Sequence, residues 1–311
     1  MAKNIKNIII LKIFLIILLV IHILNYIIND SIFKRKLKII TNKNKRTNLR
    51  LKSKFEAFFS YLNIVKEISY IYKLLKPKEV LGKTKVRIGL EGDGGYVLLN
   101  DFENIKFAYS FGIANEISFD KGLADKNIEV FMYDHTIKKL PFFNPKFHWK
   151  KIGLTEKKGK LNNMKTLDEL IKENSHENEK NMILKCDIEG SEWNILYELK
   201  NEILKQFKYI VIEFHLRVSL KVLIVKVLEK LSETHQIFHL HCNNCGPILN
   251  IDGNIICSLL EISLIIKENN SFIKSSALFP AKNIDFKNCL HKKDFNSILN
   301  IYQFDDTLNI Q

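Results

Sequence analysis

Short apolar runs rich in β-branched residues alternate with stretches of helical periodicity from about Lys78 onward. This alternation predicts an α/β domain with a mostly parallel sheet and crossover helices on both faces. The seven runs that predict strands are Lys106–Phe111, Ile128–Asp134, His148–Gly153, Met182–Asp187, Lys208–Phe214, Ile237–His241 and Leu259–Ile266. The predicted helices are Phe119–Lys126, Leu167–Glu173, Trp193–Leu204 and Leu220–Thr234. No long helix separates the last two strands, which predicts an antiparallel pair at one edge of the sheet.

A longer apolar run, from Ile8 to Ile28, is interrupted only by Lys12, His22 and Asn25. Its length is close to the roughly 20 residues that span a bilayer. The polar residues that follow do not form a small-x-small cleavage site, so we predict an uncleaved transmembrane anchor rather than a cleaved signal peptide. The chain then divides into an anchor (1–30), a basic linker with an amphipathic helix (31–75, the helix over 55–75) and a catalytic domain (76–311).

The 311 residues carry 48 Lys and Arg against 34 Asp and Glu, a net charge of +14. Much of this excess lies directly after the apolar run, at Lys34, Arg35, Lys36, Lys38, Lys43, Lys45, Arg46, Arg50, Lys52 and Lys54. Anionic headgroups attract such a stretch, although a solvated linker has the same composition. Because the cluster lies outside the predicted sheet, we do not expect nucleic acid as a partner.

A glycine turn follows the first strand in KFAYSFGIANEISF, where a helix begins near Ser118. Gly112 lets a bound cofactor approach the backbone at the carboxyl end of the sheet. Asp134 ends the next strand, about 20 residues further on, where an acid accepts hydrogen bonds from ribose hydroxyls. A nicotinamide dinucleotide and S-adenosylmethionine (SAM) both satisfy this geometry.

The most specific pattern is MILKCDIEGSEWNIL, a buried strand followed by Asp187, Glu189, Gly190 and Glu192. With Lys185 it resembles the K-x-D-x-E-G-x-E motif of FkbM-like, class I SAM-dependent methyltransferases. TLD from Thr166 resembles a further element of the same family. The stretches that resemble a membrane-anchored branch of this group are GDGGY from Gly92, YSFGI, YDHT, EFH from Glu213 and HLHCNN from His239. The resemblance covers about residues 80–266 and implies a Rossmann-like methyltransferase fold with SAM as cofactor.

The acids at the strand ends suggest roles in methyl transfer. Asp187 would position or deprotonate a hydroxyl, and Glu213 and His215 share one strand face as an acid–imidazole pair. The residues expected to bind the cofactor are Asp93, Gly94, Gly95, Tyr96, Phe111, Gly112, Ile113, Glu116, Asp134, His135, Asp187 and Glu189. At each strand end a purely structural hydrogen bond is the alternative, and Gly94-Gly95 also suits a simple hairpin turn.

No metal is predicted. Asp187 and Glu213 alone are too few ligands for magnesium, and His239, His241, Cys242 and Cys245 lack the second ligand pair of a structural zinc site. The five cysteines, which include Cys186, Cys257 and Cys289, show no spacing that fixes a disulfide pattern.

We therefore expect SAM-dependent O-methylation of a glycan or small metabolite. The alternatives are a non-catalytic membrane module with this fold and a nicotinamide-dependent reductase, which would normally carry a fuller G-x-G-x-x-G turn. The basic flank after residue 28 favours a cytoplasmic catalytic domain. The resemblance to animal secretory-pathway relatives favours the lumen, so the side of the membrane, like the oligomeric state, stays open.

Overall fold

A computed structural model describes residues 70–295 apart from 160–162, 218–220, 252–253 and 278. The chain separates into two compact units, Met1–Ile64 and Val65–Gln311, and the described residues belong to the second. The predicted anchor, the basic stretch and most of the predicted helix over 55–75 lie outside the described residues; residues 70–75 are helical. No helix in the described part is both long enough and apolar enough to cross a membrane.

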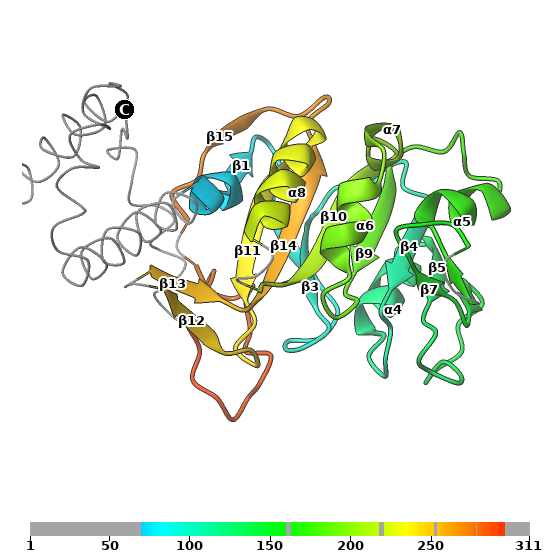
Figure 1. The fold of residues 1–311 in the computed structure, drawn as a ribbon, viewed down its shortest axis with the longest axis horizontal. Helices are drawn as coiled ribbons and strands as arrows, with labels where there is room; N and C mark the ends of the chain where they lie inside the picture. Colours follow the sequence, from blue (N-terminus) through cyan, green and yellow to red (C-terminus); the bar gives the residue numbers. More distant parts are fainter. Residues whose placement is uncertain (1–69, 160–162, 218–220, 252–253, 278, 296–311) are drawn as a thin grey trace, which may run out of the picture. The chain divides into compact units, whose positions relative to one another are not determined.

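All seven predicted strands are present in one sheet with the order β11-β14-β10-β9-β4-β5-β6 (Figure 1). Their bounds are β4 Phe107–Phe111, β5 Glu129–Tyr133, β6 Phe147–Lys150, β9 Met182–Cys186, β10 Phe207–His215, β11 His235–Cys242 and β14 Leu259–Ile266. The five strands from β10 to β6 are parallel, and β14 is antiparallel to both of its neighbours. The predicted antiparallel pair at the edge is therefore confirmed, with β14 inserted between β10 and β11.

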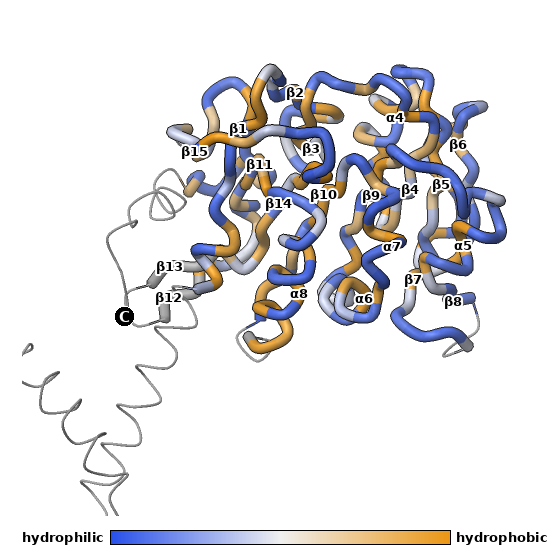
Figure 2. Tube along the Cα trace, turned by 90° about the horizontal axis from the view of Figure 1, so that it is seen from above, coloured by the Kyte–Doolittle hydropathy of each residue, from blue (hydrophilic) through white to orange (hydrophobic). Residues whose placement is uncertain are grey.

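Helices lie on both faces of the sheet (Figure 2). Their bounds are α4 Ser118–Ala124, α5 Leu167–Glu173, α6 Glu192–Glu198, α7 Asn201–Leu204 and α8 Lys221–Thr234. The predicted helix Trp193–Leu204 is broken into α6 and α7, because Leu199 and Lys200 adopt extended backbone angles. Helix α5 begins as predicted, since Thr166 and Glu169 form a reciprocal capping box.

In strand β10, successive side chains point alternately to the two faces of the sheet. Phe214 points to the helical layer and stacks on Trp193 of α6 at a centroid distance of 3.9 Å. Tyr209 and Val211 point the other way and join the core beneath α4. Glu213 follows these two at the same spacing, so it lies on the α4 face at the carboxyl end of the strand.

Smaller two-stranded sheets surround the main one. They pair β1 Lys78–Val80 with β15 Phe272–Lys274, β2 Lys85–Ile88 with β3 Tyr96–Leu99, β7 Gly153–Leu154 with β8 Met164–Lys165, and β12 Ile248–Ile251 with β13 Asn254–Cys257. The β2–β3 hairpin is closed by residues 89–95 because Ile88 pairs with Tyr96. The hairpin that Gly94-Gly95 suggested as an alternative is therefore present, but its connection is this longer loop, which reaches over the carboxyl ends of the strands.

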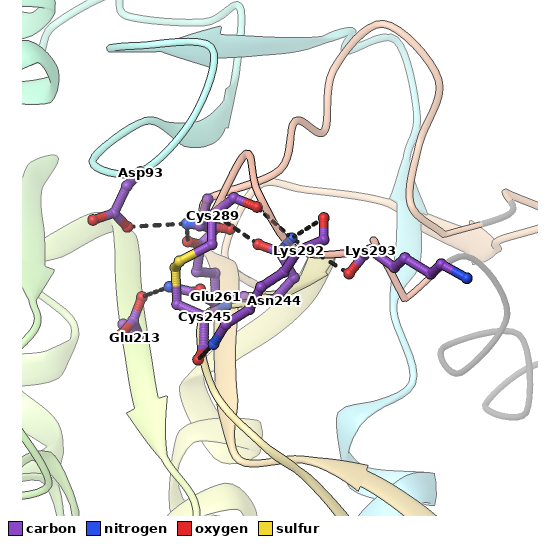
Figure 3. The surroundings of a disulfide bond; sticks show 10 residues. Asp93, Glu213, Asn244, Cys245, Glu261, Cys289, Lys292 and Lys293 are labelled. Atoms are coloured by element: carbon purple, nitrogen blue, oxygen red, sulfur yellow. Dashed lines mark hydrogen bonds between the residues drawn. A yellow bond between two sulfur atoms is a disulfide. The ribbon is translucent and has the colours of Figure 1, made fainter.

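Two disulfides hold the region after β11, where the sequence indicated no pairing. Cys242 is bonded to Cys257, and Cys245 is bonded to Cys289. Cys186 is free and buried in β9. The second disulfide ties the segment after β15 to the turn that follows β11 (Figure 3).

Candidate functional site

The turn after β4 is locked against the end of β9. Gly112 has φ +75°, and a Cβ there would collide with the carbonyl oxygen of Asp187. The Lys185 ammonium donates a hydrogen bond to the Gly112 carbonyl oxygen and lies 3.4 Å from that of Phe111. Glycine is thus required at position 112, as the sequence predicted. The group that approaches it closely is the Asp187 backbone and not a cofactor.

Asp134 is buried at the end of β5 and organises the same turn. One carboxylate oxygen accepts from the amides of Ile113 and Ala114, each at 2.9 Å. The other accepts from the amide and hydroxyl of Thr136 at 2.7 and 2.6 Å. Burial opposes ionisation, but these hydrogen bonds outweigh it and lower the pKa of Asp134. Four bonds fill the carboxylate's lone-pair positions, so binding ribose there requires one of them to open, and that role stays a prediction.

The loop 89–95 brings other predicted residues to this turn. The Leu90 amide donates to the Ser118 hydroxyl of α4 at 2.9 Å, and a Cβ on Gly94 would collide with Glu116. Tyr96, at the start of β3, donates to Asp187 at 3.3 Å. Asp93, Gly94, Gly95, Tyr96, Gly112, Glu116 and Asp187 therefore surround one corner of the sheet.

Three predicted cofactor residues lie differently. Phe111 is buried in the core and stacks on Tyr133 at 5.2 Å, and Ile113 is buried with only its amide turned to Asp134. His135 is exposed beside Asp134. The first two thus shape the turn through packing, while His135 is accessible to a ligand.

Asp187 ends β9 with about a quarter of its side chain exposed (27%), 3.9 Å from the Lys185 ammonium. Burial raises the pKa of Asp187, although the positive charges of Lys185 and His215 act against this shift. A carboxylate that is partly desolvated, oriented and still accessible is a suitable hydrogen-bond acceptor for a reacting hydroxyl.

His215, at the end of β10, lies among three acids. Its ring nitrogens are 3.3 Å from Glu192, 3.2 Å from Glu189 and 3.8 Å from Glu213. Burial alone would lower the pKa of His215, but these acids raise it to about 9. The predicted pairing with Glu213 exists, but Glu189 and Glu192 lie closer to the imidazole.

Glu189 and Glu192 of the signature motif have separate positions. The Glu192 carboxylate is fully buried and accepts from the amides of Ile188 and Gly190 at 2.7 and 3.1 Å, which fixes the turn. Glu189 has φ +58° and an 88% exposed side chain. Glu192 is therefore structural, whereas the Glu189 carboxylate is exposed to solvent and pairs with His215 at 3.2 Å.

Glu213 connects this corner to the neighbouring strands. It is buried, accepts from the Asn243 amide at 2.9 Å, and its pKa is raised to about 8 by burial and by the nearby charges of Asp187 and Glu261. Oxygen or nitrogen atoms of Asp187, Glu213 and His215 lie within 4.8 Å of one another, as do those of Asp93, Glu213 and Glu261. Either set is close enough to share a metal ion.

Sequence reasoning missed Glu261, Asn243 and Asn288 as site residues. Glu261 is the only charged residue within the apolar strand LLEISLII, and that isolated acid was the available signal. Asn288 donates to Asp93 at 3.1 Å and to Glu261 at 2.6 Å. It belongs to no periodic pattern, so no feature of the sequence marked it.

The histidines and cysteines at the end of β11 and just after it do not form a thiolate site. Cys242 and Cys245 are each in a disulfide. His239 is 2.7 Å from Asp285, and His241 is 2.9 Å from Glu261. The zinc alternative therefore loses both sulfur ligands.

Comparison with known proteins gives a family match for part of the chain. Residues 96–243 match the family model described as "Methyltransferase FkbM domain". No curated protein matches the chain. A solved structure titled "Putative hemolysin from Streptococcus thermophilus" is 12% identical with a TM-score of 0.27, covering 68% of this chain and 78% of that one, a likeness too weak to carry an argument.

Proposed function

We propose that the chain transfers a methyl group from SAM to a hydroxyl of a glycan or small metabolite, because residues 96–243 match the methyltransferase FkbM domain. The observation that carries the proposal is Asp187, accessible at the end of β9 and oriented by Lys185 and Tyr96. SAM supplies an electrophilic methyl group on a sulfonium.

The residues at this corner of the sheet suit SAM in part. Exposed Glu189 and half-buried Asp187 offer negative charge to its ammonium and sulfonium groups. The Gly112 turn presents the backbone that a cofactor approaches at the carboxyl ends of parallel strands. Asp134 fits the ribose only after one of its internal hydrogen bonds opens.

The residues of the chain then position the acceptor and hold its proton. Asp187 accepts a hydrogen bond from the acceptor hydroxyl, and the raised pKa of its carboxyl makes it a better proton acceptor than a fully solvated aspartate. Tyr96 and Lys185 keep its orientation. Alignment of the oxygen with the methyl group is expected to contribute more to the rate than proton removal.

The test is calorimetric SAM binding to the full chain, followed by formation of S-adenosylhomocysteine with a panel of methyl glycosides. We expect micromolar SAM binding that Asp187→Asn changes only a few-fold, whereas turnover falls at least 100-fold, about 2.7 kcal/mol. The matched control is Asp168→Asn, which changes an exposed acid of α5 and should retain both SAM binding and turnover. A folded chain that binds NADH and not SAM would support the reductase alternative.

We also propose that the domain folds in an oxidising compartment, which favours the lumenal over the cytoplasmic alternative. Two disulfides within the described residues support this, because cytosolic thiols are normally kept reduced. The sequence Asn269-Asn270-Ser271 matches the Asn-x-Ser acceptor pattern for glycosylation in a turn after β14 where Asn269 is exposed.

Maleimide labelling of the denatured chain tests the compartment. Material from the native source should take up one label without reductant, at Cys186, and five after reduction. A glycosidase-sensitive mass shift that Asn269→Gln removes would add independent support. Five labels without reductant would overturn the proposal.

A further inference from the structure

Two buried carboxylates face each other across the β10–β14 ladder. Glu213 is directly opposite Glu261, and Glu261 is directly opposite His241 of β11. The two acids are 7% and 5% exposed. Like charges at directly opposite positions of an antiparallel pair are destabilising, so this arrangement requires a compensating positive charge or a proton.

A third carboxylate reaches the pair from the β2–β3 loop. Oxygens of Asp93, Glu213 and Glu261 all lie within 4.8 Å of one another. Ca²⁺ binds oxygen at about 2.3–2.6 Å, so ligands on opposite sides of the ion are up to about 5 Å apart, whereas Mg²⁺ needs about 4 Å. Separations below 4.8 Å are short enough for one hard divalent cation to bridge the three carboxylates.

The described residues supply these acids with neutral donors and an imidazole but with no lysine or arginine ion pair. Asn243 donates to Glu213, and His241 lies 2.9 Å from Glu261. The Arg87 guanidinium donates its hydrogen bonds to three backbone carbonyl oxygens, and its charge acts on Glu261 without a direct ion pair. Hydrogen-bond donors behind each carboxylate are the usual outer shell of a metal site.

Asn288 gives an independent indication of a ligand. Its amide nitrogen lies between Asp93 and Glu261, yet its amide oxygen has no hydrogen-bond partner although the residue is only 9% exposed. Rotating the amide by half a turn would direct this oxygen toward the same two carboxylates. Amide oxygen and nitrogen are assigned from such networks, and a cation between the acids would favour the oxygen.

We propose that Asp93, Glu213, Glu261 and the Asn288 amide oxygen bind one hard divalent cation such as Ca²⁺ or Mn²⁺. The ligands come from the β2–β3 loop, β10, β14 and the segment tied by the Cys245–Cys289 disulfide (Figure 3). Because Glu213 is shared with the Asp187 and His215 cluster, the ion lies beside the acceptor side of the site. A role in binding an acceptor hydroxyl rests on the proposed function, but ion binding itself does not.

The experiment is a calorimetric titration of Mn²⁺, and separately of Ca²⁺, into the chelator-treated full chain. Neither SAM nor acceptor is present. We expect one ion per chain with micromolar affinity, and at least tenfold weaker binding for Glu261→Gln. The matched control is Glu268→Gln, an exposed acid just beyond the same strand, which should bind within twofold of the wild type.

Asp93→Asn provides a second variant, because it changes an exposed loop residue and is not expected to disturb the core. A folded wild-type chain with no saturable ion binding at pH 8 would overturn the proposal and leave a shared proton as the explanation. Equal affinity in Glu261→Gln, Asp93→Asn and wild type would also overturn it. Since neither SAM nor acceptor is present, these results are independent of whether methyl transfer fails.

Discussion

Gly112 and Gly159 share a left-handed backbone, with φ +75° and +71°, but differ in their surroundings. An added Cβ at Gly112 would meet backbone of Asp187, whereas at Gly159 nothing lies within 4 Å. Only the first position combines an unfavourable backbone with a collision that no side-chain movement relieves.

We expect Gly112→Ala to lower the free energy of unfolding by at least about 3 kcal/mol and Gly159→Ala by about 1 kcal/mol. Urea unfolding of both variants measures the difference. Equal losses would mean that backbone conformation alone, and not the Asp187 contact, requires glycine at position 112.

His235 is a buried residue whose ionisation opposes folding. Its imidazole contacts the Thr234 hydroxyl at 2.8 Å and the Phe207 carbonyl at 2.9 Å, and burial lowers its pKa from 6.5 to about 4. The unfolded chain therefore binds this proton more readily than the folded chain, so the stabilising effect is complete above pH 6.5 and is lost as the pH falls toward 4.

Between pH 6.5 and 4 the free energy of unfolding is expected to fall by up to about 3 kcal/mol through this one group. Unfolding free energies of wild type and His235→Gln, measured between pH 7 and 4, should converge as the pH falls. Parallel curves would show that His235 does not account for acid sensitivity in this range.

At the scale of elements, the segment 279–295 is tied to the turn that follows β11. Asn244 and Cys289 exchange two hydrogen bonds at 2.9 and 2.7 Å, and the Cys245–Cys289 disulfide joins residues 44 positions apart. The disulfide thus fixes Asn288 next to Glu261 and Asp93.

Replacing both cysteines in Cys245→Ala/Cys289→Ala should lower the free energy of unfolding by about 2–4 kcal/mol, because the open loop gains entropy in the unfolded chain. It should also weaken Mn²⁺ binding if Asn288 is a ligand. Leu290→Ala, which changes an 80% exposed side chain on the same segment, is the control. Denaturant unfolding measures the loss of stability, and calorimetry measures the loss of Mn²⁺ binding. A double variant as stable as Leu290→Ala would contradict the predicted loss of stability.

At the scale of the whole molecule, residues 65–311 cluster into one compact unit, and the basic and apolar stretches precede it. A chain that begins at Val65 should keep its melting temperature within about 4 °C, equivalent to about 1 kcal/mol or less for this size. The full chain should bind anionic vesicles and the shortened chain should not. Vesicle flotation and thermal melting test this, and retained flotation would place the membrane affinity in the catalytic unit.

The sequence determined much of the molecule through local pattern. Strand β14 and helix α5 begin and end where the apolar run and the helical periodicity predicted. The methyltransferase motif around Asp187 was recognised because its residues are contiguous, and the family match over residues 96–243 confirms it. Such features depend on neighbours within one turn or one strand, which the sequence contains directly.

Only the tertiary structure decided which distant residues share the site. The pairing of Glu213 with Glu261, the arrival of Asn288 and both disulfides depend on strand order and register across the antiparallel edge. Asp134, which was predicted to accept hydrogen bonds from ribose hydroxyls, accepts them from the Ile113 and Ala114 amides instead. Contacts of this kind join residues that are tens to hundreds of positions apart in the sequence. No local periodicity specifies them, because they depend on how the whole sheet packs.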